Sequence, residues 1–246
     1  MNMIKDIQQE ILKLKKEKDI CILAHSYEAH EILEIADYAG DSYALSVKAK
    51  EVDAKTVIMC GVRFMAETVK ILSPEKQVIL ATPEAGCEMA DMMNRAMIEK
   101  VKAKHPDYTV VAYVNTTAEL KAICDVCVTS SSAVNVVKNI ENEKILFIPD
   151  NNLGTFVKRL LPEKDIMLLD GCCPIHASVT PEEVIRAKVA HPDALILIHP
   201  ECRPDVAGMA DFIGSTADIM NFAKNSDKKE FIIGTEISIA EHLQYE

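Results

Sequence analysis

The sequence predicts an α/β fold of three α/β/α domains with small parallel sheets, related by a pseudo-threefold axis around a central cavity. The first observation behind this prediction is an internal repeat, which indicates a repeated structural unit. His105-Pro106-Asp107 recurs 86 residues later as His191-Pro192-Asp193, and each triplet precedes a short apolar run. The second observation is that strand-like runs alternate with helical patterns, as they do in parallel βα units.

The expected strands are short, rich in β-branched residues and bounded by polar residues, which is typical of buried parallel strands. Corresponding positions are 88 residues apart between the first two copies and 86 apart between the last two. The repeated triplets include Ala36-Asp37-Tyr38, Cys124-Asp125-Val126 and Ala210-Asp211-Phe212. The expected strands are 20–24, 57–60 and 78–81 in the first copy, 108–112, 145–148 and 166–169 in the second, and 194–198 and 231–234 in the third.

Apolar residues recur at helical spacing between these strands, for example over 64–72, 91–104 and 180–190. Thr180-Pro181-Glu182-Glu183 marks the start of one helix, because it offers an N-cap, a proline at the first helical position and a capping-box carboxylate. The repeat divides the chain into domains 1–86, 87–172 and 173–246. The third copy is expected to end with a helix over 238–245, before a closing strand of its own.

Composition and charge exclude several classes of function. The 246 residues are 49% apolar and 26% charged, and 27 Lys and Arg against 38 Asp and Glu give a net charge of −11. This balance argues against binding to DNA or RNA. No apolar run approaches the ~20 residues of a membrane span, and Lys5, Asp6 and Glu10 stand where a signal peptide needs an apolar core. We therefore expect a cytoplasmic protein that binds no membrane.

Candidate site residues follow the first strand of each copy, because ligands of open α/β sheets bind at the carboxyl ends of the strands. These residues form the pairs His25 and Tyr27, Tyr113 and Asn115, and His199 and Glu201. A hydroxyl follows 17 residues after the first member of each pair, at Ser42, Ser130 and Thr216. Such a hydroxyl either caps a helix or helps its N-terminus to bind an anion. The common spacing favours one shared site.

Two cysteines are repeat-equivalent and are candidates for metal ligands. Cys87 and Cys173 are 86 residues apart, and each follows a glycine-containing turn. Three thiolates brought together on a threefold axis would suit an iron–sulfur cluster with one iron free of protein ligands. By the repeat, the third thiolate falls near position 259, beyond the given sequence. The alternative is that both are ordinary buried thiols.

A second cysteine pair, Cys124 and Cys127, has the C-x-x-C spacing of metal and redox sites. Its counterparts in the other copies are small or apolar, so we expect both thiols to be buried in the core. A cysteine-based redox protein is the alternative, and it requires a solvent-accessible pair. A dinucleotide-binding enzyme is disfavoured, because no G-x-G-x-x-G follows any first strand.

The motifs together resemble those of the quinolinate synthase A family, the iron–sulfur enzymes of NAD biosynthesis. The matching segments run from the first strand to the third copy. They are Ala24-His25-Ser26-Tyr27, Gly40-Asp41-Ser42, Cys60-Gly61-Val62, Phe64-Met65-Ala66-Glu67, Ala85-Gly86-Cys87, Met89-Ala90-Asp91, Tyr113-Val114-Asn115-Thr116, Thr129-Ser130, Pro149-Asp150, Asn152-Leu153-Gly154, Cys173 with His176, His199-Pro200-Glu201-Cys202 and Gly214-Ser215-Thr216.

The resemblance implies a transferase that condenses iminoaspartate (iminosuccinate) with dihydroxyacetone phosphate to give quinolinate, phosphate and water. It implies a [4Fe-4S] cluster that acts as a Lewis acid. Cys87 and Cys173 match the family's ligands, and Cys173 is preferred to Cys172 because the family's ligand lies three residues before the histidine, here His176. The functional partner it implies is L-aspartate oxidase or aspartate dehydrogenase.

The resemblance also implies roles for the strand-end residues. Proton transfers are assigned to Tyr27, His25 and Glu201. Substrate binding is assigned to His25, Ser42, Tyr113, Val114, Asn115, Ser130, His199, Pro200, Glu201 and Thr216. Two departures from the family are Ser26, where asparagine is frequent, and the family's segment with the third cysteine, which the given sequence does not contain. The alternative is therefore a catalytically impaired, cluster-free relative that only binds dicarboxylates.

Overall fold

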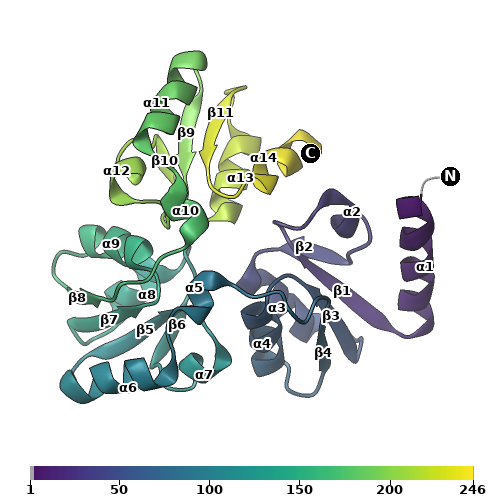
Figure 1. Cartoon of the computed structure of the whole chain (residues 1–246), viewed down its shortest axis with the longest axis horizontal. Helices are drawn as coiled ribbons and strands as arrows, with labels where there is room; N and C mark the ends of the chain where they lie inside the picture. Colours follow the sequence, from purple (N-terminus) through teal and green to yellow (C-terminus); the bar gives the residue numbers. More distant parts are fainter. Residues whose placement is uncertain (1–2, 246) are drawn as a thin grey trace. The chain divides into compact units, whose positions relative to one another are not determined.

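The computed structural model describes residues 3–245 and contains three small sheets whose strand pairs are all parallel (Figure 1). This confirms the predicted α/β fold class. The described residues form two compact units, 3–87 with 244–245, and 88–243. The division into three domains around a cavity stays a prediction.

The first unit contains one four-stranded sheet in the order β2-β1-β3-β4. Its elements are α1 (Met3–Glu17), β1 (Ile20–His25), α2 (His30–Leu33), β2 (Tyr38–Gly40), α3 (Ser42–Glu51), β3 (Thr56–Cys60), α4 (Arg63–Leu72) and β4 (Gln77–Leu80).

The second unit contains two sheets. The first has the order β6-β5-β7-β8, and its elements are α5 (Glu88–Asp91), α6 (Arg95–Lys104), β5 (Thr109–Tyr113), α7 (Ala118–Lys121), β6 (Val126–Val128), α8 (Ala133–Asn139), β7 (Lys144–Ile148), α9 (Asn151–Leu160) and β8 (Asp165–Leu168). The second has the order β10-β9-β11, and its elements are α10 (Pro174–Ser178), α11 (Pro181–Ala190), β9 (Leu195–Ile198), α12 (Pro204–Ala207), β10 (Phe212–Ile213), α13 (Thr216–Asn225), β11 (Phe231–Gly234) and α14 (Ser238–Tyr245).

The strand register reproduces the offsets of the sequence repeat. Ala24 pairs with Cys60 in the first sheet, Ala112 with Ile148 in the second and Ile198 with Gly234 in the third. These pairs are related by the same shifts of 88 and 86 residues. Every strand predicted from the repeat is present, with ends that differ by one residue at most positions. Helix α14 has the predicted bounds.

The repeated aspartate has a structural role in all three sheets. The carboxylate of Asp37 accepts the backbone N–H of Ile22 at 2.8 Å, and its own N–H donates to the Ile22 carbonyl at 2.8 Å. Asp125 makes the same pair of bonds to Val110, and Asp211 makes it to Ile196. Each aspartate therefore pairs one backbone N–H and one carbonyl of the first strand, just before the second strand begins. Buried backbone groups need such partners.

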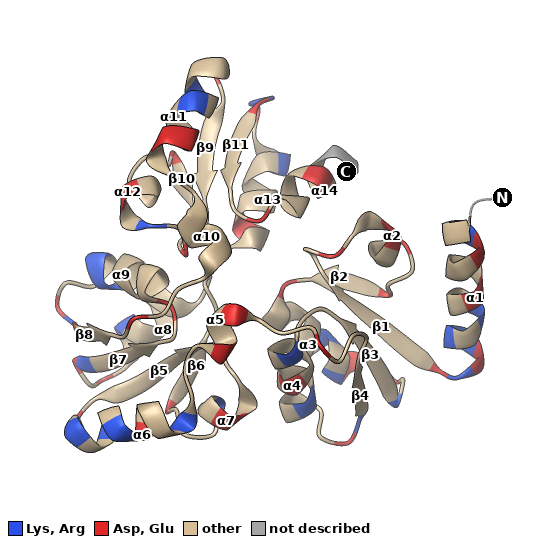
Figure 2. Ribbon diagram, viewed as in Figure 1, with Lys and Arg blue, Asp and Glu red and all other residues tan. Residues whose placement is uncertain are grey.

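Apolar side chains fill the space between sheets and helices, and charge is kept outside. In the second unit, Val110, Ala112, Leu146 and Ile148 are buried against Ile98 of α6. Figure 2 shows that Lys, Arg, Asp and Glu residues lie mainly on helices and loops. Among the described residues, no helix combines the length and the hydropathy that a membrane crossing requires.

The burial predicted for the C-x-x-C pair is wrong for Cys127. Cys127 is exposed, whereas Cys124 is half-buried against the core. Cys127 lies on β6, which is an edge strand of only three residues, so its sheet leaves one side of it uncovered. Burial still raises the pKa of both thiols, that of Cys124 to about 12. Neither thiol is therefore a reactive thiolate, which disfavours the redox alternative.

Gly171 lies where two loops of the second unit touch, and it provides a test of the packing. A Cβ on this residue would lie 2.4 Å from the Pro149 carbonyl oxygen and 2.9 Å from the Met93 methyl carbon. The backbone N–H of Asn151 also donates to the Gly171 carbonyl at 2.7 Å, so the loops cannot separate freely.

We expect Gly171→Ala to lower the free energy of unfolding by roughly 1–3 kcal/mol, the usual cost of overpacking. Urea denaturation would measure the change. Gly40→Ala is the matched control, because the nearest atom to its added Cβ lies 3.7 Å away, an ordinary contact. Equal stability of the two variants would show that the loops are less closely packed than described.

Candidate functional site

Polar side chains from several elements meet at the carboxyl ends of the strands in the second unit. Tyr113 is the last residue of β5, Asp150 lies two residues after β7, and His199 and Glu201 follow β9. Parallel strands direct such residues to the same edge of their sheet, where α/β proteins bind ligands. The short helix α10, which begins after Cys173, contributes residues to the same place.

Glu201 is the centre of this group and is only 2% exposed. The Tyr113 hydroxyl donates to Glu201 Oε1 at 2.6 Å, and His176 Nδ1 lies 3.0 Å from Glu201 Oε2. The side-chain amide of Asn152 donates to the Glu201 backbone carbonyl at 3.0 Å. One buried carboxylate thus connects the end of β9 to the end of β5 and to α10.

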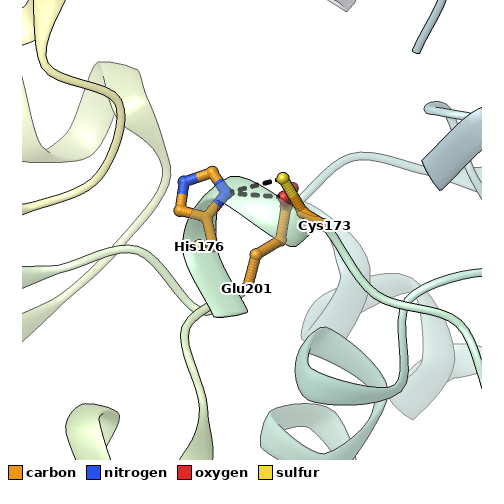
Figure 3. Close-up of side chains that lie close together, drawn as sticks. All are labelled: Cys173, His176 and Glu201. Atoms are coloured by element: carbon orange, nitrogen blue, oxygen red, sulfur yellow. Dashed lines mark hydrogen bonds and ion pairs between the residues drawn. The ribbon is translucent and has the colours of Figure 1, made fainter. Parts of the chain in front are cut away.

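His176 joins the carboxylate to a cysteine thiol. Its Nδ1 lies 3.1 Å from Cys173 Sγ as well as close to Glu201, so both side chains are directed at one nitrogen (Figure 3). Its Nε2 lies 2.9 Å from the hydroxyl oxygen of Thr235, and its ring stacks on His199 with a 4.6 Å centroid distance. The imidazole is therefore held at both nitrogens and on one face.

Cys173 is fixed through its backbone by Asp150. The Cys173 N–H donates to Asp150 Oδ2 at 2.9 Å, and the other carboxylate oxygen caps α9 by accepting the Leu153 N–H at 2.7 Å. The nearest ligand atoms of Cys173, His176 and Glu201 lie within 4.8 Å of one another. The neighbouring thiol of Cys172 does not belong to this group.

The two stacked imidazoles carry different charges at neutral pH. Burial lowers the pKa of His176, but the charge of Glu201 and the hydrogen bonds to Cys173 and Glu201 outweigh it and raise that pKa to about 10. Burial dominates at His199 and lowers its pKa to about 4. The Glu201 N–H donates to His199 Nδ1 at 3.3 Å, which makes that nitrogen an acceptor and fits a neutral ring. His176 is the cation of the pair.

The two buried carboxyl groups are shifted in opposite directions. Burial would raise the pKa of Glu201, but the imidazoles and the hydrogen bonds from His176 and Tyr113 lower it below its usual range. Burial raises the pKa of Asp150, and the charge of Glu201 adds to this effect. Environments that separate two carboxyl pKa values in this way are typical of acid–base sites.

The first unit repeats the histidine arrangement. The Tyr27 N–H donates to His25 Nδ1 at 3.1 Å, as the Glu201 N–H does to His199, and the rings of His25 and Tyr27 are 4.4 Å apart. In both histidines, Nδ1 accepts a hydrogen bond from the backbone N–H of the residue two positions later. A neutral ring in this arrangement carries its proton on Nε2.

The candidate hydroxyls are not the helix caps that the alternative interpretation required. Ser42 and Thr216 are the first residues of α3 and α13, and the caps are made by Asp41 and Ser215. Ser130 lies two residues before the N-cap of α8. The Thr129 hydroxyl, next to Ser130, forms hydrogen bonds with the hydroxyls of Ser131 and Ser132.

Among the predicted site residues, the structure brings Tyr113, His199, Glu201 and Cys173 together in the second unit. Val114 and Pro200 are buried beside them in sequence, and Asn115 is partly exposed. His25, Tyr27, Ser42 and Cys87 lie in the first unit, so a cavity shared by both sets stays a prediction.

Sequence reasoning missed Asp150 and Thr235 as members of the site. They follow β7 and β11 by two residues and one residue, respectively. Only the ends of the first strands were inspected for candidates, and the same rule applied to the third strand of each copy would have found both. His176 entered that reasoning only as a landmark for Cys173, although it links the thiol to Glu201.

Comparisons with known proteins agree on one family. The family model described as "NadA: Quinolinate synthetase A protein" matches residues 9–246. A curated quinolinate synthase of Caldicellulosiruptor saccharolyticus is 51% identical over 241 residues, which cover 98% of this chain and 80% of the relative. The quinolinate synthases of Clostridium perfringens strain 13 and Aquifex aeolicus are 49% and 45% identical, and the matches cover 97% and 98% of this chain and 79% and 75% of the relatives.

The charge assignment of the two imidazoles can be tested by nitrogen-15 NMR of the histidine rings in metal-free protein. We expect His176 to be a cation at pH 8 and His199 to be neutral with its proton on Nε2. In Glu201→Gln, burial is no longer opposed by the carboxylate charge, so the pKa of His176 should fall toward or below its ordinary 6.5. A neutral His176 at pH 8 in the unsubstituted chain would contradict the assignment.

Proposed function

The chain belongs to the quinolinate synthetase A family, and we propose that it condenses iminoaspartate with dihydroxyacetone phosphate to give quinolinate, phosphate and two waters. The observation that supports this most strongly is the ionised Glu201 held between a phenol and an imidazolium, beside a free thiol. An enzyme that oxidises aspartate would supply the unstable imine.

The proposed reaction needs several proton transfers, because a ring closes while phosphate and two waters are lost. A base must remove protons from carbon, and an acid must protonate each departing oxygen. Glu201 stays ionised, but its lowered pKa makes it a weak base, so we assign it to passing protons on rather than to removing them from carbon. Tyr113 and His176 hold the two protons bonded to its oxygens, so protons can pass along this chain of groups. Tyr27 and His25 of the first unit are proposed for further proton transfers.

Substrate anchoring is assigned to neutral donors. Thr216 lies at the N-terminus of the ten-residue helix α13, and Ser42 lies at that of α3, where backbone N–H groups and the helix dipole favour anions. His199, Asn115 and Ser130 add hydrogen-bond donors. These residues suit the carboxylates and the phosphate of the proposed substrates. Of the strand-end residues, Val114 and Pro200 are apolar and contribute shape.

The residues also fit the family's iron–sulfur cofactor. Cys87 and Cys173 are both outside any disulfide and partly accessible, and the side chain of Cys173 reaches the acid–base group. We propose that these two residues are ligands of a [4Fe-4S] cluster. When bound, the cluster would supply a Lewis acid toward substrate oxygens. Cys202 is a poorer candidate, because its buried thiol donates to the Gly234 carbonyl at 3.3 Å and burial raises its pKa to about 12.

The ligand assignment is tested by anaerobic reconstitution with iron and sulfide, followed by metal analysis and a quinolinate assay. We expect Cys173→Ser to lose most of the bound iron and the product, and the matched control Cys172→Ser to behave like the unsubstituted chain. If Cys172→Ser lost the bound iron and Cys173→Ser kept it, the cluster ligand would be Cys172 instead of Cys173. A chain that neither binds iron nor forms quinolinate would refute the proposed function.

Anion binding by Ser130 is tested without any cluster, by titrating malate in a calorimeter. We expect Ser130→Ala to weaken binding by roughly 1–3 kcal/mol, the loss of a hydrogen bond to a charged group. Ser131→Ala is the control, because the Ser131 hydroxyl is exposed and already bonds to Thr129. Equal affinities for the Ser130 variant and the control would remove Ser130 from the substrate site.

A further inference from the structure

We propose that Cys173, His176 and Glu201 form a mononuclear site for a borderline divalent cation such as Zn²⁺ or Co²⁺, distinct from an iron–sulfur cluster. The three side chains offer one sulfur, one nitrogen and one oxygen directed at a common point (Figure 3). This set of one thiolate, one imidazole and one carboxylate is typical of cations softer than Mg²⁺ and Ca²⁺.

The distances between the ligand atoms are close to those of a tetrahedral site. Bonds of about 2.3 Å to sulfur and about 2.0–2.1 Å to nitrogen or oxygen place tetrahedral ligand atoms about 3.3–3.6 Å apart. Here His176 Nδ1 lies 3.1 Å from Cys173 Sγ and 3.0 Å from Glu201 Oε2, and all three atoms lie within 4.8 Å. Movements of a few tenths of an ångström along these two edges would admit the cation.

Each proposed ligand is oriented by a second residue, as in established metal sites. Tyr113 holds Glu201 Oε1 and thereby leaves Oε2 directed at His176. Thr235 lies at His176 Nε2, so Nδ1 is the nitrogen presented to the site. Asp150 holds the backbone of Cys173. Three separate supports of this kind make the group more than a chance meeting of side chains.

The charges also balance. The cation would displace the proton on His176 Nδ1 and the thiol proton of Cys173, which are released to solvent. The resulting thiolate, neutral imidazole and carboxylate carry two negative charges, which a divalent cation neutralises. Such balance matters because the side chains of His176 and Glu201 are only 5% and 3% exposed, and a buried charge is costly unless it is compensated. Three protein ligands leave a fourth position for water or a substrate oxygen, the pattern of catalytic rather than structural zinc sites.

The site goes beyond the proposed function and does not depend on it. The two share residues: Glu201 and His176 are also proposed for proton transfer, and a cluster and a mononuclear cation cannot both occupy Cys173 in one molecule. Cation binding can therefore be measured with no iron, sulfide or substrate present, and its failure leaves the proposed condensation untouched.

Cobalt binding by the full chain is the test, because thiolate-to-Co²⁺ charge transfer gives a near-ultraviolet band and four-coordinate Co²⁺ absorbs strongly in the visible. We expect reduced, chelator-treated protein to bind one Co²⁺ with both signals, and excess Zn²⁺ to abolish them. Cys173→Ser should lose the charge-transfer band, and the control Cys172→Ser should keep it. No thiolate band in the unsubstituted chain, or an undiminished band in Cys173→Ser, would overturn the proposal.

Two further variants keep the test decisive if Cys173→Ser does not fold. Glu201→Gln keeps the size of the side chain but removes a charged ligand, so the affinity for Co²⁺ should fall by at least tenfold. Tyr113→Phe removes only the orienting hydroxyl, and loss of such a support weakens metal binding by about 10–100-fold. Unchanged affinity in both folded variants, confirmed by circular dichroism, would equally overturn the site.

Discussion

A carboxylate that is removed from water stays ionised only if its oxygens are hydrogen-bonded and a positive charge lies beside it. Glu201 meets both conditions with groups from separate elements: the phenol of Tyr113 from β5 and the imidazolium of His176 from α10. Asn152 of α9 adds a bond to its backbone carbonyl. Glu201 therefore connects the two sheets of the second unit. His176, which this contact holds, also lies against the Cys173 thiol and stacks on His199.

The same contact separates the acid from the base. Buried ion pairs add little net stability compared with apolar side chains of the same size, so stability alone gives a weak reason for this arrangement. What it does provide is a difference in pKa between groups of the same chemical type. Glu201 is kept ionised while the pKa of Asp150 is raised, and His176 is kept charged while His199 is kept neutral. Two groups of the same kind thus differ in proton affinity, once for the carboxyl groups and once for the imidazoles.

The repeat in the sequence predicted the longer strands of each sheet but not the short edge strands β2, β6 and β10. Its offsets match the register because Asp37, Asp125 and Asp211 each bond the first strand of their copy in the same way. It was insufficient for the site, because symmetry finds only positions whose chemistry is similar in all copies. Asp150 corresponds to Val62 and Glu236, and Thr235 corresponds to Pro149 and Gly61, so the repeat gives no signal there. The exposure of Cys127 was missed because small or apolar counterparts do not by themselves indicate burial: Ala39 is also exposed, and Ile213 is half-buried.

Neutral hydrogen-bond donors explain how a chain with a net charge of −11 can be suited to anionic substrates. None of the residues proposed for substrate binding is Lys or Arg. His25 and His199 each accept a backbone N–H at Nδ1, so each neutral ring carries its proton on Nε2. Neutral imidazoles, hydroxyls and the N-termini of α3 and α13 can bind carboxylates and phosphate without placing fixed cations next to Glu201. Additional cations there would compete with His176 for the carboxylate, and the bond that organises the second unit would be weakened.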